Sequence, residues 1–239
     1  MPLPTIATPT YELELPSTGR KVKYRPFLVK EEKLLVLALE SEDTKQISNA
    51  IKTVLKSCVQ TKGVKIDILP TFDIEYLFLN IRAKSVGEVI EVNLVAPDDG
   101  ETSVPVEINV EDIKVQKNND HSNKIQLDEN LIMEMKYPSL DEFIKNNFDF
   151  DEDMSVDKSF DLICSCIAKI YNSEEVWSAS DVTKKELISF LEQMNSAQFK
   201  KVEGFFTTMP KLAHKITFVN PNTKKENTVV LEGLASFFD

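Results

Sequence analysis

Alternating apolar and polar residues near the start of the chain predict a β-hairpin. Residues 11–15 and 21–24 alternate with a period of two, as half-buried strands do, and residues 17–19 between them form a Ser-Thr-Gly turn sequence. The first ten residues contain three prolines, and proline both fixes φ and lacks a backbone donor. We therefore expect an extended arm over residues 1–10, followed by the hairpin.

After the hairpin the apolar period lengthens to that of an α-helix, and three helices are predicted. The first contains the apolar run Leu34–Leu39 behind two acidic residues, which suit the positive end of a helix. The second has apolar residues at i, i+3, i+4 and i+7 over residues 47–59. The third has Thr71 as its expected N-cap and runs through Ala83. With the hairpin, these helices predict an α+β region over residues 11–86.

A period of two returns in residues 87–137, which are predicted to form a central unit of antiparallel hairpins. A strand over residues 88–95 has one mainly apolar side, and a return strand follows at residues 104–110. The Pro-Asp-Asp-Gly sequence at residues 97–100 is a strong turn signal between them. A second hairpin is expected around residues 128–130.

The chain from residue 138 to residue 239 is predicted as a helical region. Ser139 and Thr183 each open a capping-box sequence, which predicts the start of a helix. A further helix is expected over residues 157–171, and Ser196 is the expected N-cap of the last one. Alternating stretches around a turn near residue 220 then predict a terminal β-hairpin.

Hairpins and helices are segregated along the chain, so the predicted fold class is α+β. Four regions are expected: an extended arm (1–10), an N-terminal α+β region (11–86), a central β-hairpin unit (87–137), and a C-terminal helical region with a terminal β-hairpin (138–239).

Few of the side chains that catalysis and metal binding require are present. The 239 residues include two histidines, His121 and His214, and six glycines too far apart to form a phosphate-binding loop. Two distant histidines cannot make a histidine-rich zinc site. The 39 carboxylates must include close pairs, but no pair is marked as catalytic. We therefore expect no catalytic residues, no cofactor and no metal.

The three cysteines are predicted to be reduced thiols. An odd number without C-x-x-C spacing suits a cytoplasm better than a disulfide framework. Cys58 falls on the apolar stripe of the second helix and is expected in the core. Cys164 and Cys166 are two residues apart on a predicted helix and point to different sides. We expect one of them in the core and the other at the periphery, with no shared metal.

The charge balance argues against two classes of partner. Twenty-eight basic and 39 acidic residues give a net charge of −11, and arginine occurs only at positions 20, 25 and 82. Nucleic acids and anionic membranes are bound through positive fields and arginine forks, so neither is an expected partner. The chain start lacks signal-peptide features, and the run Leu34–Leu39 is too short to span a bilayer. These features predict a soluble intracellular protein.

An acidic segment with two phenylalanines is a candidate contact site for a basic partner. It consists of Phe148, Asp149, Phe150, Asp151, Glu152 and Asp153. Its three aspartates have the spacing of an EF-hand loop, but Met154 stands where the loop needs glycine and Phe160 where it needs glutamate. Calcium is therefore not expected. A solvated linker and a docking segment both stay open as interpretations.

Two more aromatic residues, Phe237 and Phe238, lie close to the C-terminal end. Aromatic side chains in such places either fold back onto the core or anchor a partner. The adjacent hairpin favours folding back for this pair, whereas Phe148 and Phe150 fit either role. All four remain candidates for partner contact.

Four longer segments resemble one protein family. They are residues 24–33 (YRPFLVKEEK), 69–78 (LPTFDIEYLF), 216–223 (ITFVNPNT) and 231–238 (LEGLASFF). These segments resemble the baseplate hub proteins of T-even-type bacteriophages, a group that includes a hub subunit and a hub assembly factor. The resemblance covers most of the chain.

The resemblance implies a non-enzymatic component or assembly factor of the contractile-tail baseplate hub. Its expected partners are other baseplate hub and tail proteins, with the tape-measure protein as a candidate, and its oligomeric state is left open. The alternative is a transient chaperone for hub or tape-measure proteins that is absent from the mature virion; a tail-associated hydrolase ranks third. The expected location is the host cytoplasm during assembly, and the virion tail for a subunit.

The resemblance implies that some relatives carry cysteines around the middle hairpin in a zinc-ribbon-like arrangement. Here the equivalent turn, residues 96–100, has the sequence Ala-Pro-Asp-Asp-Gly and contains no cysteine. We therefore predict no zinc at this turn. The hairpin is then expected to be held by its valine and isoleucine face alone.

Overall fold

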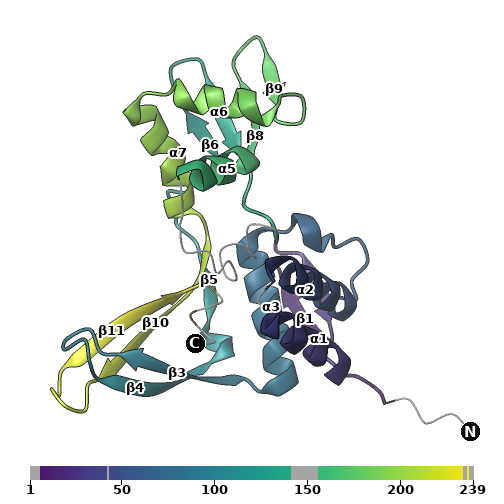
Figure 1. Ribbon diagram of the computed structural model, residues 1–239, viewed down its shortest axis with the longest axis vertical. Helices are drawn as coiled ribbons and strands as arrows, with labels where there is room; N and C mark the ends of the chain where they lie inside the picture. Colours follow the sequence, from purple (N-terminus) through teal and green to yellow (C-terminus); the bar gives the residue numbers. More distant parts are fainter. Residues whose placement is uncertain (1–5, 42, 141–155, 234–235, 237–239) are drawn as a thin grey trace, which may run out of the picture.

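The described chain packs around two separate hydrophobic cores (Figure 1). The computed structural model describes residues 6–41, 43–140, 156–233 and 236. The larger core combines the N-terminal hairpin, three helices and two long hairpins, whereas the smaller core lies between a four-stranded sheet and three further helices. Figure 1 shows the smaller lobe at the top of the view and the elements of the larger core below it. This mixed architecture confirms the predicted α+β class.

The N-terminal hairpin and the three predicted helices are present. They are β1 (Tyr11–Glu14), β2 (Lys21–Tyr24), α1 (Val29–Glu40), α2 (Thr44–Cys58) and α3 (Thr71–Val86), with a short 3₁₀ turn, η1 (Ile66–Ile68), before α3. β1 and β2 pair antiparallel, with Tyr11 opposite Tyr24. The predicted cap of α3 is wrong, because Pro70 is the N-cap and Thr71 is already helical. The Thr71 N–H donates to the carbonyl of Pro138 at 2.9 Å.

The strands of residues 87–137 are divided among three sheets. This part contains β3 (Val89–Val95), β4 (Ser103–Asn109), the 3₁₀ turn η2 (Val110–Asp112), β5 (Lys114–Gln116), β6 (Lys124–Gln126) and β7 (Ile132–Met135). The later strands of the same sheets are β8 (Ile167–Tyr171), β9 (Val176–Ser178), β10 (Lys211–Val219) and β11 (Glu226–Glu232). The predicted β3–β4 and β6–β7 hairpins are confirmed. However, β5 pairs with β10, while β7 pairs with β8 in the other lobe. These long-range pairings separate neighbours in sequence, so the segment is not one compact unit.

The prediction of a helix over residues 157–171 is wrong for the second half of this range. Helix α5 spans Val156–Cys166, and the next five residues form β8 between β7 and β9. The apolar spacing of this segment fits a helix, but its isoleucines and tyrosine also favour a strand, and pairing on both sides decides the outcome. Cys164 and Cys166 are both buried, with 5% and 0% exposure, so the expectation of one peripheral thiol is also wrong.

Two further helices, α6 (Lys184–Glu192) and α7 (Ser196–Thr208), complete the smaller lobe. The predicted capping box is confirmed, because the Thr183 N–H donates to Glu186 Oε2 at 2.7 Å and the Glu186 N–H donates to Thr183 Oγ1 at 3.3 Å. Asn195, and not Ser196, is the N-cap of α7, since its side chain accepts the Gln198 N–H at 3.0 Å. Both helices bury apolar side chains against the sheet.

A cluster of aromatic rings joins the two lobes. Phe72 of α3 meets Tyr137 edge-on at a centroid distance of 5.0 Å, and Tyr137 stacks on Phe205 of α7 at 5.6 Å. His121 packs against both rings, and its two ring nitrogens lie 2.9 Å from Thr208 Oγ1 and 3.1 Å from Tyr137 Oη. Burial lowers the pKa of His121. The neutral ring therefore belongs to the packing that fixes one lobe against the other.

Hydrogen bonds fasten the tip of the β3–β4 hairpin to the tip of the β10–β11 hairpin. Asn220, which is fully buried, donates through Nδ2 to Asp98 Oδ1 at 2.9 Å and to Asp99 Oδ2 at 2.8 Å. Asn227 donates to Asp98 at 2.8 Å, and Thr223 also donates to it. Figure 1 shows the two hairpins side by side. The expectation that the apolar face alone holds the middle hairpin is therefore wrong.

We call this group of residues the clasp: Asp98 and Asp99 from one hairpin, and Asn220, Thr223 and Asn227 from the other. Its hydrogen bonds also set the charge state of the two aspartates. Hydrogen bonds from Thr223 and Asn220 hold the pKa of Asp98 below its usual value, and those from Thr102 do the same for Asp99. Both aspartates are thus ionised acceptors at neutral pH. The clasp occupies the turn at which some relatives are expected to carry zinc-ribbon cysteines.

Replacing Asn220 by alanine should lower the free energy of unfolding by about 2 kcal/mol, because it removes two hydrogen bonds to carboxylates from a buried position. The matched control is Asn222→Ala in the same turn, an exposed side chain that donates once, to Thr102 Oγ1. Its cost should stay within about 0.5 kcal/mol. Urea denaturation of both variants measures the difference, and equal losses would contradict the clasp.

Candidate contact surface on helix α1

The contact residues predicted from the sequence lie outside the described part of the chain. They are Phe148, Asp149, Phe150, Asp151, Glu152, Asp153, Phe237 and Phe238. The helix predicted to begin at Ser139 falls in the same gap after residue 140. The roles of these residues therefore stay predictions.

Helix α1 is fixed to the hairpin by a buried ion pair. Arg25, which follows β2, places Nη2 2.8 Å from Glu31 Oε1 in the first turn of α1, and the two side chains are only 13% and 5% exposed. Glu31 Oε2 also accepts the Leu28 N–H at 2.8 Å, which satisfies one donor ahead of the helix. The first turn of α1 is thereby tied to the end of β2.

The same contacts determine the ionisation of Glu31 and of the neighbouring thiol of Cys58. Burial by itself raises the pKa of Glu31, but the hydrogen bonds from Arg25 and Leu28 outweigh it, so the net pKa lies below the usual glutamate value. Cys58 of α2 lies beside the pair, with Sγ 3.8 Å from Arg25 Nη1. Burial raises the pKa of this thiol to about 11, so Cys58 is a protonated core residue, as predicted.

The solvent side of α1 is unusually apolar. Five large apolar side chains, which we call the α1 surface, are exposed: Val29 (80%), Leu34 (37%), Val36 (47%), Leu37 (54%) and Leu39 (45%). The same helix buries the carboxylate of Glu31. An ordinary surface helix exposes mainly charged residues and turns its large apolar ones to the core, whereas α1 exposes both kinds. Such a helix is typical of a surface that another molecule covers.

A shallow groove of about 280 Å³ extends the α1 surface toward α2. Leu34, Leu37 and Ala38 line it from α1, and polar side chains, among them Gln46 and Asn49, line it from α2. An apolar ridge beside amide and hydroxyl groups suits a protein partner, because interfaces combine an apolar centre with a polar rim. Figure 1 places α1 and α2 on the side of the larger lobe away from the two long hairpins.

The histidines and acidic residues provide little for catalysis in the described part of the chain. His121 is engaged in the aromatic junction, and His214 lies within β10 opposite Leu231. Among the described residues, no group of three or more His, Cys, Asp or Glu side chains could hold a metal ion. Within the same ranges, no helix has the length and apolar character needed to cross a bilayer.

One comparison with known proteins decides the family. The family model described as T4 bacteriophage base plate protein matches residues 8–239. The chain belongs to this family. Membership in the T4 baseplate protein family implies contacts with other tail proteins, and the family indicates no enzyme activity. No curated protein and no solved structure matches the chain. The resemblance is thus confirmed for the baseplate family, which is a broader group than the hub.

The sequence prediction missed the α1 surface although a signal for it was present. The run Leu34–Leu39 is six apolar residues long, so no rotation of a helix can bury all of them against one neighbour. A helix that is apolar on every side predicts either complete burial or a partner. The structure leaves α1 at the surface, so the described chain does not bury the whole run.

Proposed function

We propose that this protein is a component or assembly factor of the baseplate hub and acts through protein–protein contacts. The observation that carries the proposal is the α1 surface, five exposed apolar side chains on one helix of a baseplate-family protein. Its occupant is a neighbouring hub or tail protein, because membership in a T4 base plate protein family supports contacts with other tail proteins. The four segments that resemble hub proteins support the hub, and residues 24–33 among them include the start of α1.

Burial of the α1 surface by a partner would contribute to the free energy of binding. A fully buried leucine or valine side chain contributes about 1.5–3 kcal/mol relative to an exposed one, so covering a half-exposed one contributes about 1 kcal/mol. Five such side chains can support a contact, although association also costs translational and rotational freedom. The groove toward α2 adds polar groups that can orient the partner.

Two forms of this function differ in where the protein ends up. A hub subunit stays in the virion tail, whereas a transient chaperone for hub or tape-measure proteins acts in the host cytoplasm and then leaves. Quantitative mass spectrometry of purified virions separates them. A fixed ratio to other baseplate proteins supports the subunit, and absence from particles supports the chaperone.

A pull-down tests whether either form applies. The tagged full-length chain is co-expressed with the hub proteins and the tape-measure protein of the same phage, and the retained proteins are identified. We expect at least one hub protein to be retained at moderate salt. Retention of none of them would contradict the proposal for both the subunit and the chaperone.

We further propose that the acidic segment contributes to these contacts. Changing Phe148 and Phe150 together to serine should weaken retention of the partner about fivefold or more, because aromatic anchors dominate interface energy. The matched control changes Asn146 and Asn147, the two residues immediately before the acidic segment, to serine. Both variants are compared in the same pull-down, and equal retention would contradict a role for the phenylalanines. Phe237 and Phe238 are secondary candidates, to be tested in the same way.

A further inference from the structure

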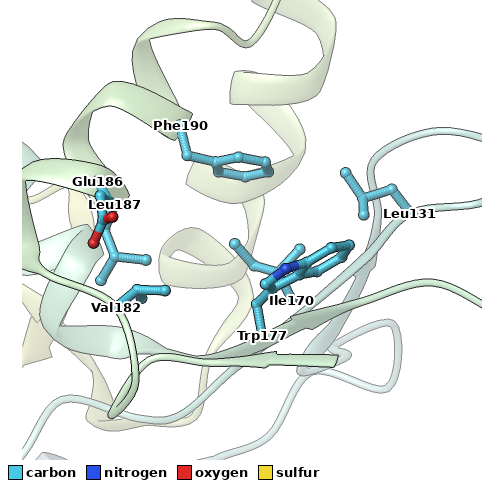
Figure 2. A pocket seen from close by; sticks show the side chains of 7 residues that line it. All are labelled: Leu131, Ile170, Trp177, Val182, Glu186, Leu187 and Phe190. Carbon is cyan, nitrogen blue, oxygen red and sulfur yellow. The ribbon is translucent and has the colours of Figure 1, made fainter. Parts of the chain in front are cut away.

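An apolar pocket of about 310 Å³ lies in the smaller lobe, between helix α6 and the β8–β9 end of the sheet. Figure 2 shows the rings of Phe190 and Trp177 on opposite sides of the hollow, with Ile170 near Trp177 and Leu131 at one end. Ile170 and Leu187 belong to the smaller core, with exposures of 6% and 7%. Among the described residues that line the pocket, Glu186 carries the only charged group.

The position of Trp177 makes the pocket accessible from outside. β9 is an edge strand of the sheet, and Trp177 in its middle keeps 39% of its surface exposed. Tryptophan is enriched among the residues that dominate binding energy, because it combines a large apolar area with few rotamers. Its neighbour Val176, 64% exposed, points to the opposite face of the strand. Trp177 therefore faces the pocket, and Val176 faces away from it.

The described segments that carry the pocket are acidic. Residues 124–140 and 156–208 together contain 11 carboxylates and eight lysines, which gives a net charge of −3. Exposed carboxylates stand on the segments around the lining: Asp128, Glu129, Glu174, Glu175, Asp181 and Glu186. Of the two lysines at the start of α6, Lys184 is paired with Asp161 at 2.5 Å. The surroundings of the pocket are thus apolar inside and negative outside.

We propose that this pocket binds a basic amphipathic segment of another protein. One or two large apolar side chains of that segment enter between Phe190 and Trp177, while flanking lysines or arginines face the surrounding carboxylates. The charge complementarity selects this occupant, because Glu186 would repel the head group of an anionic apolar ligand. A second copy of the chain is also disfavoured, since its net charge of −11 opposes self-association.

This inference goes beyond the proposed function, because the pocket lies in the smaller lobe and the α1 surface lies on the larger one. Figure 1 places α6 at the top of the view and α1 near the bottom. Two separate contact sites would allow the protein to hold two partners at once. The proposal can be tested with the purified full-length chain alone, so its failure would leave the hub assignment intact.

Trp177 is the only tryptophan in the chain, so its fluorescence reports directly on the pocket. The probe is a synthetic 14-residue amphipathic helix made of leucine and lysine, and the control peptide has glutamate at every lysine position. We expect the lysine peptide to shift Trp177 emission to shorter wavelength in a saturable way and to bind more weakly as salt rises. The glutamate peptide should leave the emission unchanged.

Two variants separate binding in the pocket from general charge attraction. Leu131→Lys places a cation at the end of the pocket and should weaken binding of the lysine peptide about tenfold or more. Val176→Lys adds the same charge on the other face of β9 and should change affinity by about twofold at most. Equal losses in both variants would overturn the proposal. If the lysine peptide causes no emission shift, two other results would also overturn the proposal. One is an emission shift caused by oleate, and the other is self-association of the chain observed by sedimentation velocity.

Discussion

Replacing Glu31 by glutamine is expected to lower the free energy of unfolding by about 3 kcal/mol. The substitution leaves the guanidinium of Arg25 nearly buried, at 13% exposure, without an opposite charge 2.8 Å away. Removing one partner of such a pair is costly because the remaining charge cannot be solvated. The matched control is Glu32→Gln, one residue further on and exposed, which should cost less than about 0.5 kcal/mol.

The same pair predicts a dependence on pH. The pKa of Glu31 is lower in the folded protein than in the unfolded chain, so the stability that it contributes is present above the unfolded pKa of about 4.3. This contribution is lost as the pH falls through the folded pKa. Chemical denaturation of the wild type and of Glu31→Gln should therefore give curves that converge in acid. A constant difference down to the lowest pH would contradict the ion pair.

A double variant with both charges removed tests the mechanism of this loss. Arg25→Met combined with Glu31→Leu should recover much of the stability lost in Glu31→Gln, because well-packed apolar residues often replace a buried pair at little cost. If the double variant is no more stable than Glu31→Gln, the loss comes from packing around α1 and not from an unpaired charge.

Changing Val36 and Leu37 together to serine is expected to weaken binding of the hub partner about a hundredfold. Each side chain is about half exposed in the free protein, with exposures of 47% and 54%. Truncating a residue at the centre of an interface costs about 1–2 kcal/mol, and two such losses give about 3 kcal/mol. Stability should change little, since neither residue belongs to the buried core. Calorimetry with the partner retained in the pull-down measures the affinity.

The long hairpin offers a matched control for this variant. Val219 and Val230 are also exposed valines, at 55% and 52%, but they lie on β10 and β11. Changing both to serine removes a similar apolar area from a different surface. The affinity for the partner should then stay within about threefold of the wild type. Equal losses in the two double variants would show that the α1 surface has no special role.

Local patterns predicted the elements whose contacts are local. Helix α2 follows from its unbroken apolar stripe, and the capping box at Thr183 places the start of α6 correctly. The alternation in β3 predicts its buried side, Ile90, Val92 and Leu94. In each case, neighbours in sequence provide the signal.

Long-range pairing explains what the sequence patterns missed. β5 pairs with β10 almost 100 residues later, and β8 is a strand because β7 and β9 flank it. The clasp joins Asp98 to Asn220 and Asn227 across a similar distance in sequence. No window of a few residues contains such information. The pocket around Trp177 has the same origin, because its lining comes from three separate segments of the smaller lobe.

Photo-cross-linking from α1 tests the central claim most directly. A photoreactive amino acid is placed at position 37, on the α1 surface, or at position 230, on β11, and each variant is expressed during phage infection. We predict a covalent adduct with another baseplate protein from position 37 and little or none from position 230. Adducts of equal yield from both positions, or none from position 37, would contradict the claim that α1 joins this protein to the baseplate.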